Sequence, residues 1–118
     1  MNLFSLAVRR TAFWACLLAI VVLSLLPGDR LPTVFAWWDK AQHALGFAVL
    51  TGIGLFAYAQ ARWRLPVGLL LFGAAIELAQ GASGWRTGDW LDLLADAVGI
   101  LGALLLWWLV MPRRPGKA

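Results

Sequence analysis

The chain has 118 residues, of which 62% are hydrophobic and 14% charged, and its formal net charge is +4. This composition excludes an ordinary soluble globular domain, in which about 45–50% of residues are apolar and about 25% are charged. It also disfavours nucleic-acid binding, because the basic residues lie at the ends of apolar stretches and form no basic face.

Four apolar stretches predict an all-α membrane protein. Each stretch is close to the ~17–25 residues that a helix needs to cross the hydrocarbon core of a bilayer. They cover approximately residues 10–26, 41–61, 65–82 and 91–111. The connections between them are short and contain proline, glycine or arginine, which leaves no room for a soluble domain. We therefore expect residues 1–118 to form a single domain, a compact bundle of four transmembrane helices.

The first stretch follows Arg9 and Arg10, so a cleaved signal peptide, even one of the twin-arginine kind, is the alternative to a first helix. No small-x-small cleavage site precedes Pro27, and cleavage would leave an odd number of spans. We therefore expect an uncleaved helix. Cys16 lies inside it and is the only cysteine of the sequence, which excludes an intramolecular disulfide.

The basic residues predict the orientation of the helices in the membrane. One side of the predicted bundle carries Arg30, Lys40 and Arg86. The other side carries Arg9, Arg10, Arg62, Arg64, Arg113, Arg114 and Lys117. The positive-inside rule therefore places both termini in the cytoplasm. Tryptophans fit the two interfaces in the same way, with one group formed by Trp37, Trp38, Trp85 and Trp90 and the other by Trp63, Trp107 and Trp108.

The acidic residues all belong to the extracytoplasmic half. They are Asp29, Asp39, Glu77, Asp89, Asp92 and Asp96. At ~1.5 Å of rise per residue, Asp92 lies about 4–5 Å deeper in the membrane than Asp89, and Asp96 about 10 Å deeper. Spacings of three and four residues keep these three carboxylates on one face of the last helix.

Two further helices carry polar residues at the same depth. Asp39 and His43 share a face at the start of the second helix, and Glu77 and Gln80 share a face near the end of the third. Because an ionised group facing lipid costs several kcal/mol, these polar faces should turn toward one another. We expect an outward-facing polar pocket with Asp39 and His43 at its rim and Glu77 and Asp96 at its floor.

Two segments of the sequence resemble each other. "DKAQHALGF" from Asp39 and "DLLADAVGI" from Asp92 both fit D-x-x-x-[HD]-A-[LV]-G-[FI]. A parallel duplication of a helix hairpin is one interpretation, and the general abundance of alanine and glycine in membrane helices is the other. Small residues four apart also favour close helix packing. They are Ala48 and Gly52 in the second helix and Ala95, Gly99 and Ala103 in the fourth.

The order D-K-x-x-H, E-x-x-Q, then an arginine and a run of aspartates, resembles the VanZ-like family of small bacterial integral membrane proteins. The matching positions are Asp39, Lys40, His43, Glu77, Gln80, Arg86, Asp89 and Asp92. Asp96 departs from the asparagine usual in the family, and Phe47 stands where tyrosine is frequent. The resemblance covers nearly the whole chain and implies a multi-span cell-envelope protein. It links the chain to antibiotic resistance, since a named member is associated with resistance to the glycopeptide teicoplanin, and it specifies no reaction.

Three kinds of function remain open. The first is recognition or remodelling of a lipid-linked envelope molecule, such as a cell-wall precursor or glycolipid. Its ligand-binding residues would be Asp39, Lys40, His43, Glu77, Gln80, Arg86, Asp89, Asp92 and Asp96. The second is an acid/base or metal-assisted enzyme acting on an envelope lipid, with His43, Glu77 and Asp92 as catalytic candidates. A divalent cation would then be held by His43, Glu77, Asp92 and Asp96.

The third interpretation is structural. Asp39 would pair with Arg86, and His43 with Glu77, so that buried ion pairs fix the arrangement of the helices. Proton-coupled transport is a further alternative, and it would require an oligomer because four short helices form a narrow bundle.

Overall fold

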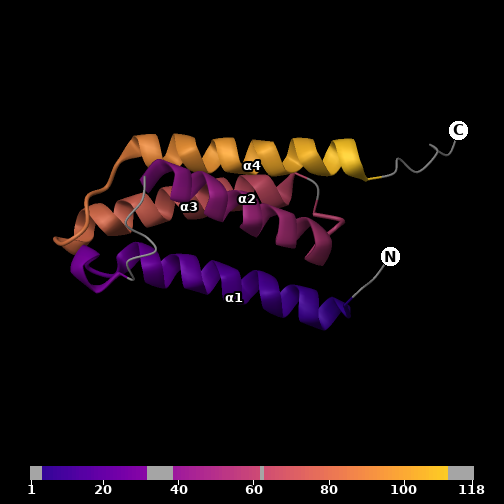
Figure 1. The fold of residues 1–118 in the computed structure, drawn as a ribbon, viewed down its shortest axis with the longest axis horizontal. Helices are drawn as coiled ribbons and strands as arrows, with labels where there is room; N and C mark the ends of the chain where they lie inside the picture. The colour runs from indigo at the N-terminus through magenta and orange to yellow at the C-terminus, as the bar shows by residue number, and fades with distance from the viewer. Residues whose placement is uncertain (1–3, 32–38, 62, 112–118) are drawn as a thin grey trace, which may run out of the picture.

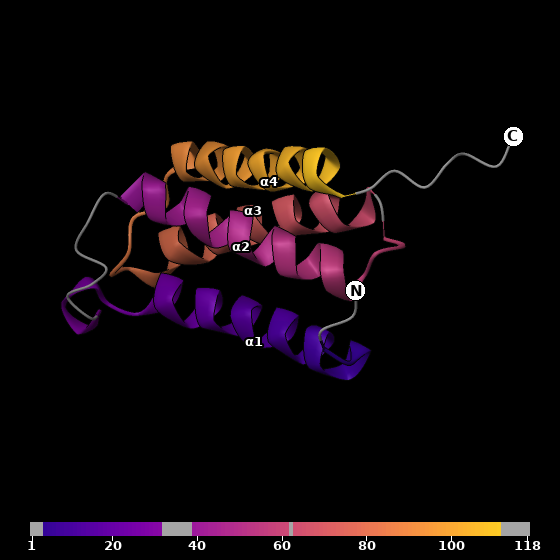
Figure 2. The same ribbon diagram turned by 45° about the vertical axis from the view of Figure 1, so that its right-hand side comes forward.

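The computed structural model describes residues 4–31, 39–61 and 63–111, and over these residues the chain is helical. Its elements are α1 (Leu6–Leu25), the 3-10 turn η1 (Gly28–Arg30), α2 (Asp39–Ala57), α3 (Arg64–Ser83) and α4 (Trp90–Val110). This confirms the predicted all-α class. Figures 1 and 2 show the four α-helices side by side along the long axis, with α2 and α3 between α1 and α4.

The ends of the helices are set by local sequence. Ser5 caps α1 by accepting a hydrogen bond from the Val8 N–H, so this helix begins before residue 10, where the apolar pattern had placed its start. Asp89 caps α4 by accepting from the Leu91 N–H. Gly84 ends α3 with a φ of 83°, a left-handed conformation that glycine adopts without steric cost. α2 begins at Asp39, so the first charged residues of the predicted pocket belong to the helix itself.

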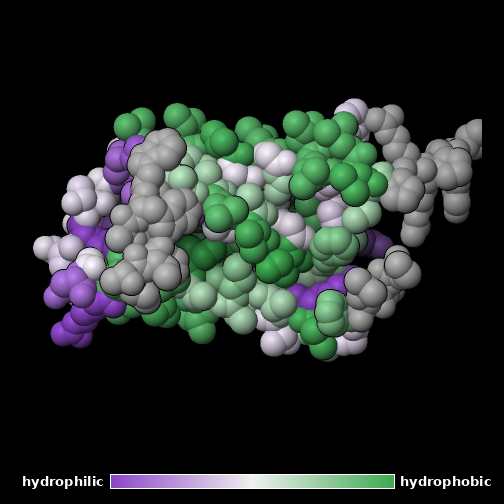
Figure 3. Space-filling view, viewed as in Figure 1, coloured by the Kyte–Doolittle hydropathy of each residue, from purple (hydrophilic) through white to green (hydrophobic). Residues whose placement is uncertain are grey.

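Three of the helices, α1, α3 and α4, are long and apolar enough to cross a membrane. α2 has 19 residues but falls outside this group, because Asp39, Lys40 and His43 make its first two turns polar. The fourth predicted span therefore stays a prediction, as does the four-span bundle. Large apolar side chains such as Leu18, Leu71 and Leu105 are exposed on the three apolar helices. Figure 3 shows the same pattern, with a largely hydrophobic flank and hydrophilic residues gathered at the end that holds η1.

The core lies around α2, which contacts α1, α3 and α4. Its buried residues include Phe13, Phe47, Leu50, Leu69 and Ile100, which come from all four α-helices. α2 and α4 run in the same direction, because Lys40 reaches Asp89 at one end and the Phe56 ring packs on Trp107 at the other, with 4.7 Å between ring centroids. This common direction agrees with a duplicated hairpin but does not test it.

The small residues predicted to allow close helix packing do so at Gly99 but not at Gly52. A Cβ atom at Gly99 would collide with the main-chain carbonyl of Ala44, so this glycine permits the close approach of α4 to α2. Gly52 has no neighbouring atom within 4 Å of the equivalent position. The prediction that Gly52 makes a close contact is therefore wrong within this chain. Gly52 instead lines an apolar groove between the C-terminal halves of α2 and α4.

The end opposite the charged residues is basic. Arg9 Nη1 donates to the Phe56 carbonyl oxygen at 2.6 Å, and Arg10 Nε donates to that of Ala57 at 3.5 Å. The beginning of α1 and the end of α4 lie at this same end (Figure 1). Other residues used to predict the orientation lie outside the described residues, namely Trp37, Trp38, Arg62, Arg113, Arg114 and Lys117.

Candidate functional site

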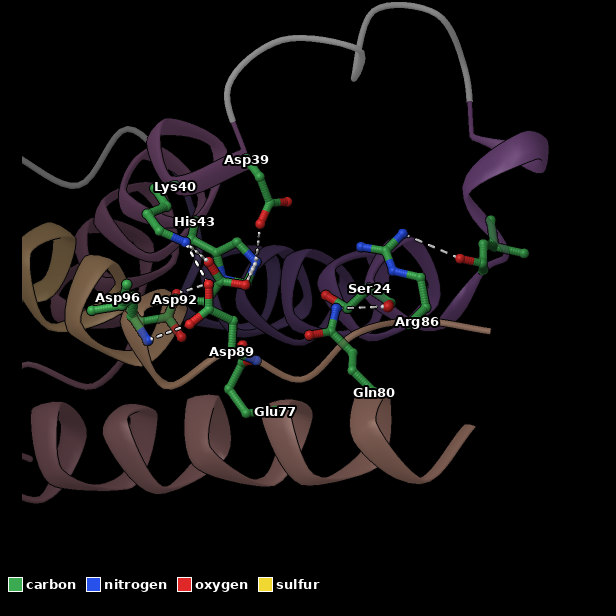
Figure 4. Close-up of polar contacts among 12 residues, drawn as sticks. Ser24, Asp39, Lys40, His43, Glu77, Gln80, Arg86, Asp89, Asp92 and Asp96 are labelled. Atoms are coloured by element: carbon green, nitrogen blue, oxygen red, sulfur yellow. Dashed lines mark hydrogen bonds and ion pairs between the residues drawn. The ribbon is translucent and has the colours of Figure 1, made fainter. Parts of the chain in front are cut away.

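The polar residues predicted to form a site gather at the end of the molecule where α2 and α4 begin and α3 ends (Figure 4). α2 supplies Asp39, Lys40 and His43. α3 supplies Glu77 and Gln80, and α4 supplies Asp92 and Asp96. The segment between α3 and α4 adds Arg86 and Asp89. We refer to Asp39, Lys40, His43, Glu77, Asp89, Asp92 and Asp96 as the charged cluster.

Lys40 connects the start of α2 to the start of α4. Its Nζ lies 2.8 Å from Asp89 Oδ2 and 2.9 Å from Asp92 Oδ1. The hydrogen bond from Lys40, and next the one from the Leu91 N–H, lower the pKa of Asp89 below its ordinary value. Asp92 is almost fully buried, so Lys40 supplies the positive charge that this carboxylate would otherwise lack. Lys40 therefore joins the starts of two helices through ion pairs and is also a candidate ligand-binding residue.

His43 lies at the centre of the cluster. Its Nδ1 is 2.8 Å from Asp96 Oδ1, a hydrogen-bonding distance, and Asp96 is fully buried. Its Nε2 is 3.6 Å from Asp92 Oδ2 and 3.9 Å from Asp39 Oδ2, both too long for a hydrogen bond. The partner of His43 is thus Asp96, and the pairing with Glu77 expected in the structural interpretation is replaced by it. The hydrogen bond to Asp96 fixes the orientation of the imidazole ring.

Glu77 reaches the cluster from α3. Its Oε2 accepts a hydrogen bond from the Asp89 main-chain N–H at 2.9 Å. This contact depends on Gly88, where a Cβ atom would lie 2.8 Å from the Glu77 carbonyl oxygen, so a larger residue would push the chain away from α3.

Two buried carboxylate oxygens have no hydrogen-bond partner among the described residues, Glu77 Oε1 and Asp96 Oδ2. Buried polar atoms of this kind are uncommon and call for an explanation.

Gln80 and Arg86 form their hydrogen bonds with the end of α1 rather than with the charged cluster. Gln80 Nε2 donates to the Ser24 carbonyl oxygen at 2.9 Å, and Arg86 Nη1 donates to that of Leu26 at 3.2 Å. Between them, Trp85 Nε1 donates to the Leu25 carbonyl oxygen at 2.8 Å. These bonds satisfy carbonyl groups at the end of α1 that have no partner within the helix. No ion pair joins Asp39 to Arg86 among the residues that the structure describes, so the pair expected in the structural interpretation is absent there.

A cavity of about 380 Å³ opens beside the cluster, between α1 and α2. Asp39 and His43 line one side of it, and Arg86 lines the other. Figure 4 shows the Arg86 guanidinium across an open space from these two residues. The remaining lining residues are Ile20, Leu23, Ser24, Leu31, Gln42, Gly46 and Phe47. The cavity is therefore apolar along α1 and charged at both ends of its rim, a combination suited to an amphiphilic ligand.

The capping role of Trp85 could not be read from the sequence, because its partner is a main-chain carbonyl. One signal was present. α1 ends at Leu25 without a glycine or asparagine to close it, and Pro27 follows. A helix that ends in this way leaves carbonyl groups for donors from other parts of the chain.

No family model, curated protein or solved structure matches the chain. The resemblance to the VanZ-like family consequently rests on the motif residues alone. The fold and the site together define a class of protein: an all-helical protein with three helices able to cross a membrane and a partly buried charged cluster at one end. Such clusters in membrane proteins mark functional sites by default, since each charge is costly to bury.

Proposed function

We propose that this protein is a VanZ-like component of the bacterial cytoplasmic membrane that binds the anionic head group of a lipid-linked cell-envelope molecule. In this proposal both termini are cytoplasmic, α2 is the fourth membrane span, and the cavity opens toward the outer leaflet. The observation that carries the proposal is the placement of Arg86 on one wall of the cavity and of Asp39 and His43 on the opposite wall.

Arginine suits an anionic head group, because its planar guanidinium presents five N–H donors and binds phosphate or carboxylate through two parallel hydrogen bonds. The bond to the Leu26 carbonyl orients the Arg86 side chain along the cavity rim. Across the cavity, Asp39 is a hydrogen-bond acceptor for sugar hydroxyl or ammonium groups. Ile20 and Leu23 provide apolar wall for the first carbons of a lipid chain.

The His43–Asp96 hydrogen bond supports a second candidate function on the same ligand. A buried carboxylate that orients an imidazole is a common arrangement for a general base. His43 would then accept a proton from a head-group hydroxyl or from water, with Glu77 and Asp92 as the further catalytic candidates. Turnover of a head group by the purified protein, lost in His43→Gln, would distinguish this enzyme from a binding protein.

Lipid binding is tested with the purified protein in detergent, titrated with a polyprenyl phosphate and with the corresponding uncharged polyprenol. Arg86→Gln removes the charge and keeps a polar side chain at this position. We expect this variant to bind the phosphate at least about tenfold more weakly, equivalent to about 1.4 kcal/mol. Arg30→Gln makes the same change in the exposed η1 turn and should bind normally. Equal affinity for phosphate and alcohol, or unchanged binding by Arg86→Gln, would contradict the proposal.

A further inference from the structure

We propose that His43, Glu77 and Asp96 together bind one divalent transition-metal cation between α2, α3 and α4. Each of these residues offers one ligand atom, and the three atoms lie within 4.8 Å of one another. The three come from three different helices and lie together within the charged cluster (Figure 4). A cation at this position would therefore hold the three helices together in addition to any part in ligand binding.

Two buried carboxylate oxygens without a hydrogen-bond partner are the independent observation that points to a cation. Glu77 is 3% exposed and Asp96 is 0% exposed, yet Glu77 Oε1 and Asp96 Oδ2 have no hydrogen-bond partner among the described residues. Burying such an oxygen without a partner is costly, and burying a carboxylate charge without a counter-charge is more so. Coordination of a cation satisfies both oxygens at once.

The charge balance of the cluster favours the same conclusion. Five carboxylates belong to it, those of Asp39, Glu77, Asp89, Asp92 and Asp96, whereas Lys40 is its one permanent cation. Among the described residues Lys40 forms its ion pairs with Asp89 and Asp92, and it forms none with Glu77 or Asp96. A divalent cation next to Glu77 and Asp96 would supply a positive charge that Lys40 does not bring to these two carboxylates.

The ligand types and the space agree with a metal of the Zn²⁺ or Mn²⁺ kind. One imidazole with two carboxylates suits such cations and leaves coordination positions for water or substrate. With metal–ligand bonds of about 2.0–2.2 Å, ligand atoms on one cation lie about 3–4 Å apart, so modest side-chain rotations would complete the site. Asp96 Oδ2 packs against Gly73, where a Cβ atom would lie 2.7 Å away, so this glycine permits the position that the carboxylate occupies.

The site also adjoins the cavity, because His43 contributes to both. The cation site does not depend on the lipid-binding proposal, and it is tested without lipid. Failure of lipid binding and failure of cation binding are therefore scored separately.

Cation binding is measured on the full-length protein in detergent, stripped with chelator and titrated with Zn²⁺ or Mn²⁺ by calorimetry, with bound metal counted by elemental mass spectrometry. We expect about one equivalent to bind. Glu77→Gln and Asp96→Asn should each weaken binding at least tenfold, and Asp29→Asn, in the exposed η1 turn, should leave it unchanged. Absence of Zn²⁺ and Mn²⁺ binding by the wild-type protein would overturn the proposal and leave protons as the occupants of the two carboxylates.

A second group, Asp39, His43 and Asp92, has three ligand atoms within the same distance and shares His43. Asp39→Asn separates the two groups, since Asp39 belongs only to the second. We expect this variant to retain binding within threefold. Loss of cation binding in Asp39→Asn, with retention in Asp96→Asn, would assign the cation to the second group and overturn the proposal. If Glu77→Gln fails to fold, Glu77→Asp keeps the charge on a shorter side chain, and unweakened binding by that variant would count against the site.

Discussion

Gly99 of α4 lies directly against the main-chain carbonyl of Ala44 in α2, at a distance that no side chain could share. The hydrogen bond between His43 and Asp96 joins the same two helices, since His43 directly precedes Ala44 in α2 and Asp96 lies three residues before Gly99 in α4. The absence of a side chain at Gly99 therefore determines how closely α4 approaches α2, and with it whether Asp96 reaches the imidazole. The geometry of the charged cluster depends on this packing.

We expect Gly99→Ala to destabilise the protein by about 1–3 kcal/mol, because the added methyl group must displace main chain rather than a flexible side chain. Gly52→Ala is the matched control, since it introduces the same methyl group in α2 where nothing lies within 4 Å. Thermal unfolding in detergent, followed by circular dichroism, compares the two. Equal unfolding temperatures for the two variants would show that the α2–α4 contact is looser than the structure has it.

Lys40→Met should lower the unfolding temperature, because it removes the cation shared by Asp89 and the buried Asp92 while preserving the aliphatic part of the side chain. Lys40→Arg keeps a positive charge of similar reach and should lose less stability. The same unfolding assay separates them. If Lys40→Met were as stable as the wild-type protein, the two ion pairs would contribute nothing to holding α2 against α4.

Asp89 gives a pH dependence whose sign follows from its lowered pKa. The unfolded carboxyl has a pKa of about 3.9, so the stability that Asp89 contributes is fully present above that pH. It is lost as the pH falls through the lower pKa of the folded state. We therefore expect the difference in unfolding temperature between wild-type and Asp89→Asn protein to be greatest near neutral pH and to shrink in acid below pH about 4. A difference that grew in acid would contradict the assignment.

The charged cluster could be predicted because its residues repeat at helical spacing at the start or end of apolar stretches. Asp92 and Asp96 are four residues apart, as are Asp39 and His43, so each pair had to share a helix face. Which acid meets His43 could not be predicted in this way. That choice depends on the rotation of each helix and on the contact at Gly99, and the structure selects Asp96.

The hydrogen-bond partners of Gln80 and Arg86 could not be predicted from the sequence, for a different reason. Both were predicted to bind the ligand, Gln80 because it shares a helix face with Glu77 and Arg86 because it matches the arginine of the family motif. Their partners are carbonyl oxygens of Ser24 and Leu26, and main-chain groups are the same in every residue. Only the position of the end of α1 in the folded protein shows that Gln80 and Arg86 donate hydrogen bonds to it. Arg86 also lines the cavity.

The capping of α1 leads to a prediction about stability. Gln80→Leu removes the donor to the Ser24 carbonyl, and the Gln80 side chain that supplies it is 1% exposed. An unsatisfied buried carbonyl costs about 1–3 kcal/mol, so we expect a loss of stability of this size, reduced by the removal of Gln80 Oε1, which itself has no described partner. Gln60→Leu, in the exposed turn after α2, is the control and should be neutral. Hydrogen exchange at the end of α1 would show whether the loss is local.

Orientation in the membrane is the last prediction, and it decides whether the cavity faces the lipid-linked molecules of the outer leaflet. The basic contacts of Arg9 and Arg10 lie at the end of the helices away from the charged cluster, which the positive-inside rule assigns to the cytoplasm. In a Cys16→Ala background, Thr87→Cys should react in intact cells with a membrane-impermeant thiol reagent, whereas Gln60→Cys should react only after the cells are opened. Both positions are exposed, so accessibility in the folded protein is matched. Labelling of Gln60→Cys in intact cells, with protection of Thr87→Cys, would place the charged cluster on the cytoplasmic side and direct the search for its ligand to the inner leaflet.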